Sequence, residues 1–354
     1  MRSLALIAGL LCPALAWGQE PTRTRRIEVG GFVDVYYAYD FGKPRTLDRV
    51  LTTQAARHNE INVNLAHLAA SLSEPRVRAR LAVQFGTAVQ VNSAGEPTIG
   101  STSGPEISRH LQEARVGVRP APNVWIDAGI YSSYIGAESW ISRENPTYSR
   151  SLVAEFTPYY LSGLRLSWQA SPRLAVQFHV MNGWQKVSED NGAKALGARI
   201  DWSVHPGTEI GATVFAGNEQ PSGRSAATRW LHQVIATHRQ GRMQWQVEAD
   251  FGHEAGAQWH GGAVVSRVAI ANAVWLSGRL ETYHDPAGIT VAPSGGQGLV
   301  ATGFSIGLDL GIDGLLWRSE LKALDAEAAV FPRDGLPNGS RHSLALISSF
   351  ALGF

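Results

Sequence analysis

The last twelve residues of the chain form a strongly alternating segment. They read SLALISSFALGF from Ser343 to Phe354, and every second residue from Leu344 onward is a large apolar one, except Ser348. A period of two identifies a β-strand with one apolar face. Such a strand invites aggregation when it stands uncovered in water, whereas a strand that closes a barrel in a bilayer has its backbone groups paired. The segment therefore favours a membrane barrel.

The first residues have the pattern of a secretory signal peptide. Arg2 supplies a positive charge, an apolar stretch runs from Leu4 to Leu15, and small residues follow. This stretch is too short to cross a bilayer as a helix. We expect residues 1–18 to be removed, which leaves one barrel domain of residues 19–354.

Composition excludes several classes of protein. Loss of Arg2 with the signal reduces the 31 basic residues to 30, which balance the 30 acidic ones, so no charge excess points to nucleic acid. Cys12, the only cysteine, lies in the signal, so the mature domain has no disulfide. The histidines lack a repeated metal-ligand spacing, and no Gly-x-Ser-x-Gly elbow occurs. The sequence therefore predicts no cofactor, no metal and no enzyme.

Apolar and charged side chains alternate in segments throughout the chain. The clearest run from Arg76 to Thr87, from Arg242 to Phe251 and from Val300 to Ile312. Segments of about ten residues with this period are typical of membrane barrels, in which apolar side chains face lipid and polar ones face the lumen. A soluble β-sandwich also alternates and is the alternative on this pattern alone.

Short and long connections alternate between these segments. The short ones are Ser73–Arg76, Arg119–Asn123, Ala170–Arg173, His205–Gly207, Arg239–Gly241, Ile270–Asn272 and Gly311–Gly314. The longer polar ones are Asp40–Asn59, Thr87–Arg109, Ser132–Leu161, Gly183–Ala195, Gly217–Thr228, Gly252–Gln258, Asp285–Gly298 and Asp325–Arg341. Bacterial outer-membrane barrels have short periplasmic turns and longer external loops.

The fifteen connections predict an all-β, antiparallel, up-and-down transmembrane barrel of 16 strands, with 14 or 18 as the alternative counts. Both termini would then lie in the periplasm. The count depends on Tyr148–Phe156, which could form a strand of its own. We assign this segment to the third long loop because an extra strand would break the parity.

A barrel of about 16 strands is wide enough for an aqueous channel. Its inward positions carry balanced charge, and mixed charge on a wet wall suits small polar solutes. The predicted pore-lining residues are Asp34, Arg76, Arg78, Arg80, Glu113, Arg115, Asp127, Arg165, Arg199, Asp201, Glu248, Asp250, Arg279, Glu281, Arg318 and Glu320. Three consecutive inward arginines, at 76, 78 and 80, would favour anions locally unless nearby acids cancel them. The alternative is that these groups only solvate and brace the wall.

The third long loop, near residues 133–160, is the best candidate for narrowing the channel. It is rich in charged and aromatic side chains for an external loop. The constriction candidates are Glu138, Arg143, Glu144, Tyr148 and Arg150. Folded inward, the loop would set carboxylate and guanidinium groups against the wall, and an ordinary surface loop is the alternative.

Six stretches in the N-terminal half resemble the OmpL-like β-barrel porin family of Gram-negative outer membranes. They are GGFVDVYYAYDFGKP (Gly30–Pro44), NEINVNLAHL (Asn59–Leu68), YSSYIGAESW (Tyr131–Trp140), NPTYSRSL (Asn145–Leu152), PYYLSGLRLSW (Pro158–Trp168) and VMNGW (Val180–Trp184). Beyond Trp202 the likeness is limited to the barrel pattern and the terminal aromatic residue. The resemblance implies a diffusion porin without a cofactor and defines no binding residues.

We therefore expect an exported outer-membrane porin through which small hydrophilic solutes or ions diffuse passively. The expected partners are outer-membrane lipid and lipopolysaccharide, and the barrel-assembly machinery, which would recognise the C-terminal strand. A homotrimer is expected by analogy with other 16-stranded porins. The alternatives are an adhesin or structural anchor that acts through its loops and, less favoured, a barrel hydrolase that acts on lipid.

Deletion of Phe354 tests the expected assembly signal. A C-terminal strand that ends in Phe resembles the recognition signal of the insertion machinery. We expect the deletion to lower the amount of protein in the outer membrane more than it lowers the conductance of the molecules that insert. Quantitative immunoblots of membrane fractions and single-channel recordings measure the two effects, and normal membrane levels would contradict the assignment.

Overall fold

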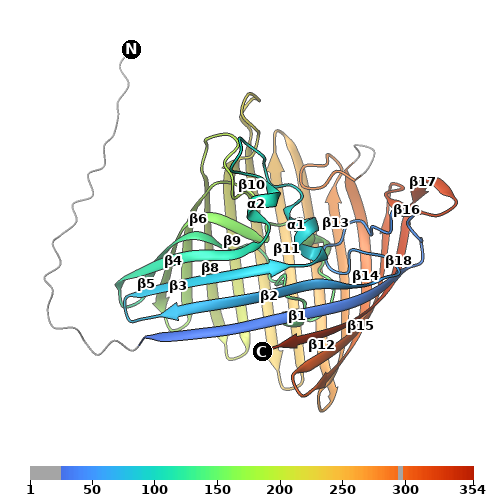
Figure 1. Cartoon of the computed structure of the whole chain (residues 1–354), viewed down its shortest axis with the longest axis horizontal. Coiled ribbons are helices and arrows are strands. Elements are labelled where there is room, and N and C mark those ends of the chain that lie inside the picture. The colour runs from blue at the N-terminus through green and yellow to red at the C-terminus, as the bar shows by residue number, and fades with distance from the viewer. Residues whose placement is uncertain (1–24, 294–297) are drawn as a thin grey trace, which may run out of the picture.

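The computed structural model describes residues 25–293 and 298–354, and its main body is one closed antiparallel barrel of 16 strands (Figure 1). The predicted signal peptide, residues 1–18, lies outside the described residues. The barrel strands are β1 (Arg26–Asp40), β2 (Ile61–Ser73), β3 (Val77–Phe85), β4 (Leu111–Ala121), β5 (Val124–Ser132), β6 (Tyr160–Ser171), β7 (Leu174–Met181), β8 (Ala195–His205), β9 (Thr208–Asn218), β10 (Thr228–Gln240), β11 (Met243–Glu254), β12 (Ala257–Ala271), β13 (Val274–Asp285), β14 (Leu299–Ile312), β15 (Leu315–Ala326) and β18 (His342–Gly353). Each strand pairs with its neighbours in the chain, which confirms the predicted up-and-down barrel and its strand count.

Short helices and one extra hairpin lie in the long connections. They are α1 (Thr87–Ser93), α2 (Pro105–Ser108), the 3₁₀ turn η1 (Ser142–Glu144), α3 (Leu152–Glu155), and the pair β16 (Phe331–Arg333) and β17 (Leu336–Ser340). No helix among the described residues is long and apolar enough to cross a membrane.

The C-terminal strand closes the barrel, as predicted. β18 pairs antiparallel with β1, from Phe32 opposite Gly353 to Asp40 opposite Ala345. The Gly31 N–H donates to the Phe354 carbonyl at 2.8 Å, and the Phe354 N–H donates back to the Gly31 carbonyl at 3.0 Å. The last residue therefore belongs to the seam that joins the two ends of the sheet.

The predicted connections agree with the structure at all but one place. Tyr148–Phe156 contains no strand, so its assignment to the third long loop is confirmed. The predicted long connection Gly252–Gln258 is wrong, because β11 continues to Glu254 and β12 begins at Ala257. The two residues between them, Ala255 and Gly256, have φ of 50° and 82°. Two positive φ values form the tight hairpin turn that fits the twist of the flanking strands.

The outer face of the wall is apolar between two rows of aromatic side chains. Leu81, Val116 and Phe304 are among its exposed residues. Trp168 and Trp202 project near the predicted short turns, and Trp230 and Phe251 project near the opposite end of the wall. Aromatic residues are enriched at both interfaces of a membrane, so the two rows mark the edges of the lipid-facing band.

Gly129 allows two strands to approach closely, and its replacement tests the packing of this wall. It lies in β5 opposite Gly163 of β6, with φ of 128°, and a Cβ there would stand 2.1 Å from the Ala114 carbonyl oxygen. We expect Gly129→Ala to destabilise the barrel by about 1–3 kcal/mol, because alanine strains this backbone and collides with the backbone of β4. The temperature at which the folded band disappears in a gel-shift assay measures the loss. Gly95→Ala is the control, since a Cβ at Gly95 meets nothing within 4 Å, and equal behaviour of the two variants would contradict the explanation.

Candidate functional site: the loop inside the barrel

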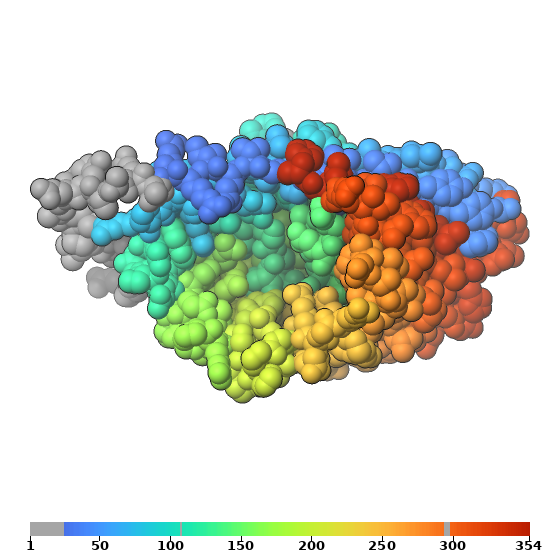
Figure 2. All heavy atoms as spheres, turned by 90° about the horizontal axis from the view of Figure 1, so that it is seen from below, coloured from blue at the N-terminus to red at the C-terminus, as the bar shows by residue number. Residues whose placement is uncertain are grey.

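The third long loop, residues 133–159, crosses the inside of the barrel between β5 and β6. Its backbone and side chains bond to inward-facing groups of β1, β8, β10, β11, β13 and β15. Figure 2 views the molecule from the end with the short turns and shows a hollow that the loop fills only in part. The site therefore consists of this loop, the wall that holds it and the space beside it.

The first part of the loop is bound to β7, β8 and β9. The ring of Tyr134 stacks on His179, with ring centroids 3.9 Å apart. The Tyr134 hydroxyl donates to the Val214 carbonyl at 3.0 Å. Arg199 donates to the carbonyl oxygens of Tyr134 and Gly136 at 2.8 and 3.2 Å. One wall guanidinium thus satisfies two loop carbonyls.

The next two peptide groups are bound to β10 and β11. The Gly136 N–H donates to the Gln233 side chain at 2.7 Å, and the Ala137 N–H donates to the Glu248 carboxylate at 3.2 Å. Gln233 in turn donates to Glu248 and Asp250 at 2.9 and 2.8 Å. Buried backbone groups need partners of this kind, and here the wall supplies them.

Asp34 and Arg318 hold the middle of the loop against β1 and β15. The Asp34 carboxylate accepts hydrogen bonds from the Ser142 hydroxyl at 2.8 Å and the Tyr148 hydroxyl at 3.2 Å. Arg318 donates to the carbonyl oxygens of residues 142, 145 and 146. It also pairs with Asp309 at 2.9 Å, and its side chain is completely buried.

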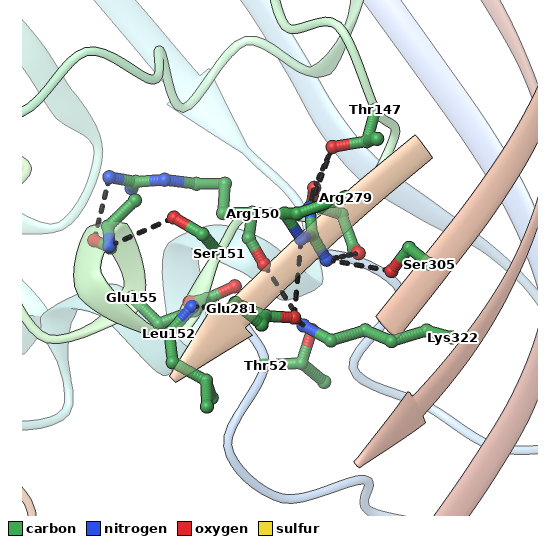
Figure 3. Close-up of polar contacts among 12 residues, drawn as sticks. Thr52, Thr147, Arg150, Ser151, Leu152, Glu155, Arg279, Glu281, Ser305 and Lys322 are labelled. Carbon is green, nitrogen blue, oxygen red and sulfur yellow. Dashed lines mark hydrogen bonds and ion pairs between the residues drawn. The ribbon is translucent and has the colours of Figure 1, made fainter. Parts of the chain in front are cut away.

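Arg279 and Glu320 bind the turn that follows. Arg279 donates to the Thr147 hydroxyl at 2.6 Å (Figure 3). It also donates to the Ser149 carbonyl at 2.6 Å. Glu320 accepts the Ser149 N–H at 2.7 Å and its hydroxyl at 2.5 Å. Arg279 also lies 3.2 Å from Glu281 and 3.5 Å from Glu320. Charge-assisted bonds of this kind are the stronger ones in proteins.

The helix α3 is held by charge on one side and by apolar packing on the other. The Leu152 N–H donates to Glu281 at 2.6 Å, and Lys322 donates to the Arg150 carbonyl at 3.0 Å (Figure 3). Leu152 and Val153 are fully buried in one hydrophobic cluster with Trp259 and Tyr283 of the wall. The lumen beside β12 and β13 is therefore a packed core at this level.

The first external loop reaches the third loop from above. The Thr53 N–H and hydroxyl donate to the Glu155 carboxylate at 3.1 and 2.8 Å. The Gln54 amide donates to the Trp140 carbonyl at 3.1 Å. The first and third long loops thus contact each other inside the barrel, next to β13, β15 and β1.

The wall from β3 to β6 carries a separate cluster of charged side chains, which pair with one another and not with the loop. Asp127 pairs with Arg78, with Arg115 at 3.2 Å and with Arg165 at 3.0 Å. Arg80 pairs with Glu113 at 3.2 Å. Arg78 and Arg80 are thus ion-paired, but four arginines share two carboxylates in this cluster, so its positive charge is only partly offset. The third, Arg76, lies exposed in the turn before β3 and not on the wall.

Three cavities border the loop on its open side. One of about 560 Å³ lies against β8 to β11, one of about 340 Å³ against β3 to β5, and one of about 430 Å³ against β1, β2 and β18. Glu144 borders all three cavities, and Gly136 and Ala137 border the first two. The space beside the loop therefore converges on Glu144.

A family model described as "Putative beta-barrel porin-2, OmpL-like" matches residues 26–352. The chain belongs to this OmpL-like porin family. No curated protein matches the sequence. Among the residues that the structure describes, no group of three or more His, Cys, Asp or Glu side chains is placed to hold a metal ion.

Solved porins share the fold of this OmpL-like porin. The anion-selective porin from Comamonas acidovorans is 8% identical, with a TM-score of 0.61 over 93% of this chain and 100% of that one. The trimer form of OmpT, an outer membrane protein of Vibrio cholerae, is 9% identical, with a TM-score of 0.60 over 93% and 99% of the two chains. Salmonella typhi OmpF in complex with daunomycin is 10% identical, with a TM-score of 0.60 over 93% and 97%. Identities this low show the fold alone.

The five constriction candidates take different positions in this porin. Glu138, Tyr148 and Arg150 are buried, whereas Arg143 is half-buried and Glu144 is exposed. Burial raises the pKa of the Glu138 carboxyl, and Arg279 and Arg150 offset part of that rise. Arg150 lies over the Tyr159 ring at 3.8 Å. Three of the five are thus buried in the loop, and Glu144 is the most exposed of them, with Arg143 beside it at the cavity against β1, β2 and β18.

The predicted pore-lining residues fall into separate groups. Seven of them bond to the third loop, namely Asp34, Arg199, Glu248, Arg279, Glu281, Arg318 and Glu320. Arg78, Arg80, Glu113, Arg115, Asp127 and Arg165 pair with one another on β3 to β6. Asp201 pairs with Arg199 at 2.7 Å, and Asp250 accepts from Gln233. Most of these charges therefore bind other protein groups and not open water.

Sequence reasoning missed the apolar part of the inner wall. Phe215, Leu231, Trp259 and Tyr283 are buried with the loop in one cluster. The signal was present, because Trp259 and Tyr283 share the parity of inward positions such as Ala263 and Glu281 in their own strands. Large apolar residues at inward-facing positions indicate that another part of the chain packs against them inside the barrel.

Replacement of Arg279 tests whether the wall charges stabilise the loop. Arg279→Met removes the partner of Glu281 and Glu320 and two donors to the loop, so both carboxylates lose a buried counter-charge. We expect a loss of about 3–5 kcal/mol, the usual effect of breaking a buried pair, seen as a lower unfolding temperature in detergent. Arg224→Met, at an exposed position between β9 and β10, is the control. An unchanged unfolding temperature for Arg279→Met would show that the loop is held by other contacts.

Proposed function

We propose that this outer-membrane porin lets small hydrophilic solutes diffuse passively through the three cavities that border its third loop, which lie against β8 to β11, against β3 to β5 and against β1, β2 and β18. Residues 1–18 would direct its export. The observation that carries the proposal is the position of Glu144, which borders all three cavities beside the loop. A group at such a junction meets every solute that takes this route.

The side of the loop toward β13 and β15 is an unsuitable route. There the loop backbone is bonded to Arg279, Arg318 and Glu320, and Leu152 and Val153 pack against the wall. A solute would have to break several charge-assisted hydrogen bonds to pass. The open side requires no such rearrangement, because its cavities already exist at about 340 to 560 Å³.

Charge on the open side is mixed, which suits polar solutes of either sign. Arg173, Arg239 and Glu209 are exposed and line the cavity against β8 to β11. On the loop side the exposed Glu144 contributes a carboxylate opposite them. Rings and clusters of charge tune selectivity in narrow aqueous pores, so the balance at this junction would set the preference of the channel.

We further propose the assembly and the partners of the porin. A homotrimer is supported by the trimer form of the similarly folded Vibrio cholerae protein. Contacts with lipid and lipopolysaccharide are supported by the apolar outer face, and recognition by the barrel-assembly machinery is supported by the aromatic C-terminus at Phe354. The porin would have no enzymatic activity, and adhesion or anchoring through the loops is the function to consider if the protein does not conduct.

Neutralisation of Glu144 tests the route. We expect Glu144→Gln to keep the discrete conductance steps of the wild type and to shift the reversal potential in a KCl gradient toward anion preference, because a carboxylate leaves the narrow region. Planar-bilayer recordings of the purified protein measure both quantities. Asp334→Asn is the control, since it removes a carboxylate from the external hairpin away from the cavities.

The possible outcomes separate the function from the route. A wild-type protein without conductance steps would refute the porin function and leave adhesion or anchoring. Normal steps with an unchanged reversal potential in Glu144→Gln would refute the route past Glu144 and leave the porin function intact.

A further inference from the structure

A groove lies on the outer, lipid-facing surface near the long loops. It has a volume of about 640 Å³ and spans β13, β14, β15 and β18, below the hairpin β16–β17. The side chains that form it include Leu280, Phe304, Ala323 and Leu344. These four residues face one another in register across the strands. Ala323 is the smallest of the row, so the groove opens between Phe304 and Leu344.

The row above is polar. This row lies two residues along each strand from the apolar one, toward the long loops. In it Thr282 is opposite Thr302, Thr302 is opposite Asp325, and Asp325 is opposite His342. His342 lies 2.9 Å from Asp325, and both side chains are exposed. The groove therefore crosses the boundary between the apolar band and the polar rim within two residues of each strand.

Histidines mark the same boundary on the neighbouring strands. His232 and His260 are exposed on the outer face of β10 and β12, beside the aromatic residues Trp230 and Phe251. His260 stacks on His284 of β13, with ring centroids 4.7 Å apart. Amphipathic rings occupy the headgroup level of membranes. The polar end of the groove thus lies at the level of lipid headgroups.

The overhanging hairpin brings a cation to this end. Arg333 of β16 lines the groove, is exposed, and forms no ion pair with any residue that the structure describes. The hairpin is held in place, because the Asp334 N–H donates to the Gly42 carbonyl at 2.8 Å and Asp334 pairs with Arg45 at 3.1 Å. A guanidinium fixed above an apolar groove matches a phosphate head above a hydrocarbon chain.

We propose that this groove, the rim groove, binds one phosphorylated glycolipid of the outer leaflet, the lipid A part of lipopolysaccharide. One acyl chain would lie over Ala323 between Phe304 and Leu344, and a phosphate would accept hydrogen bonds from Arg333. A second apolar hollow of about 460 Å³ lies on the outer face across β1 to β5, but the rim groove lies beneath the hairpin that carries Arg333. The proposal rests on the contact with lipopolysaccharide proposed above and is independent of the route of solutes through the lumen.

Native mass spectrometry of the mature full chain in mild detergent tests the proposal, with purified lipid A as the probe. We expect Arg333→Glu and Ala323→Phe each to weaken lipid A binding about tenfold, the first by repelling the phosphate and the second by filling the groove. The controls are Arg224→Glu, in another external loop, and Ala249→Phe, on the outer face of β11. Both controls should bind as the wild type does. If Ala323→Phe does not fold, Thr302→Phe fills the same groove from β14.

Three further probes identify the ligand. Dephosphorylated lipid A should bind more weakly than lipid A and should not respond to Arg333→Glu. Equal binding of inorganic pyrophosphate would overturn the role of the groove, and equal binding of phosphatidylglycerol would overturn the assignment to a glycolipid. Retention of lipid A by both groove variants, or its loss from both controls, would overturn the proposal. Unchanged conductance steps in the groove variants would show that the solute route is unaffected.

Discussion

The structure depends on hydrogen bonds between the backbone of the third loop and charged side chains of the barrel wall. A loop that crosses the inside of a barrel carries peptide groups with no strand partner, and leaving them buried and unpaired is costly. Here Arg199, Arg279 and Arg318 donate to loop carbonyls, whereas Glu281 and Glu320 accept loop N–H groups. The wall charges are thus the hydrogen-bond partners of a segment that has no secondary structure over most of its length.

The same charges stabilise one another. Arg279 lies between Glu281 and Glu320, and Arg318 lies beside Asp309. A buried charge is tolerated when it is paired and its remaining hydrogen-bonding capacity is used, and the loop backbone uses that capacity. Loop and wall are therefore mutually dependent. The consequence for function is an asymmetric lumen, which is packed toward β13 and β15 and open toward Glu144, where three cavities meet.

Much of the fold could be predicted because each element is encoded locally. The alternation from Leu344 to Phe354 requires a strand with one apolar face, and the alternation of short and long connections requires a particular number of strands. The prediction of a long connection at Gly252–Gln258 was wrong because a polar stretch of seven residues with two glycines is typical of a loop. Its central pair can form a two-residue turn and leave the rest to the strands. Whether such a stretch forms a long loop or a two-residue turn depends on which residues can adopt a positive φ, and not on polarity alone.

The candidate site was less predictable, since a residue's parity says which face it is on and not what it meets there. The alternation of residues predicts that both Arg78 and Arg318 face inward. In the structure Arg78 pairs with Asp127, whereas Arg318 binds the loop. The sequence by itself determined a closed barrel with an apolar outside and charges inside, because strand periodicity is a property of neighbouring residues. Only the tertiary structure decided which charges bind the loop, which pair within the wall and which face open space. Those partners lie up to 176 residues apart, as Ser142 and Arg318 do, and only closure of the barrel brings them together.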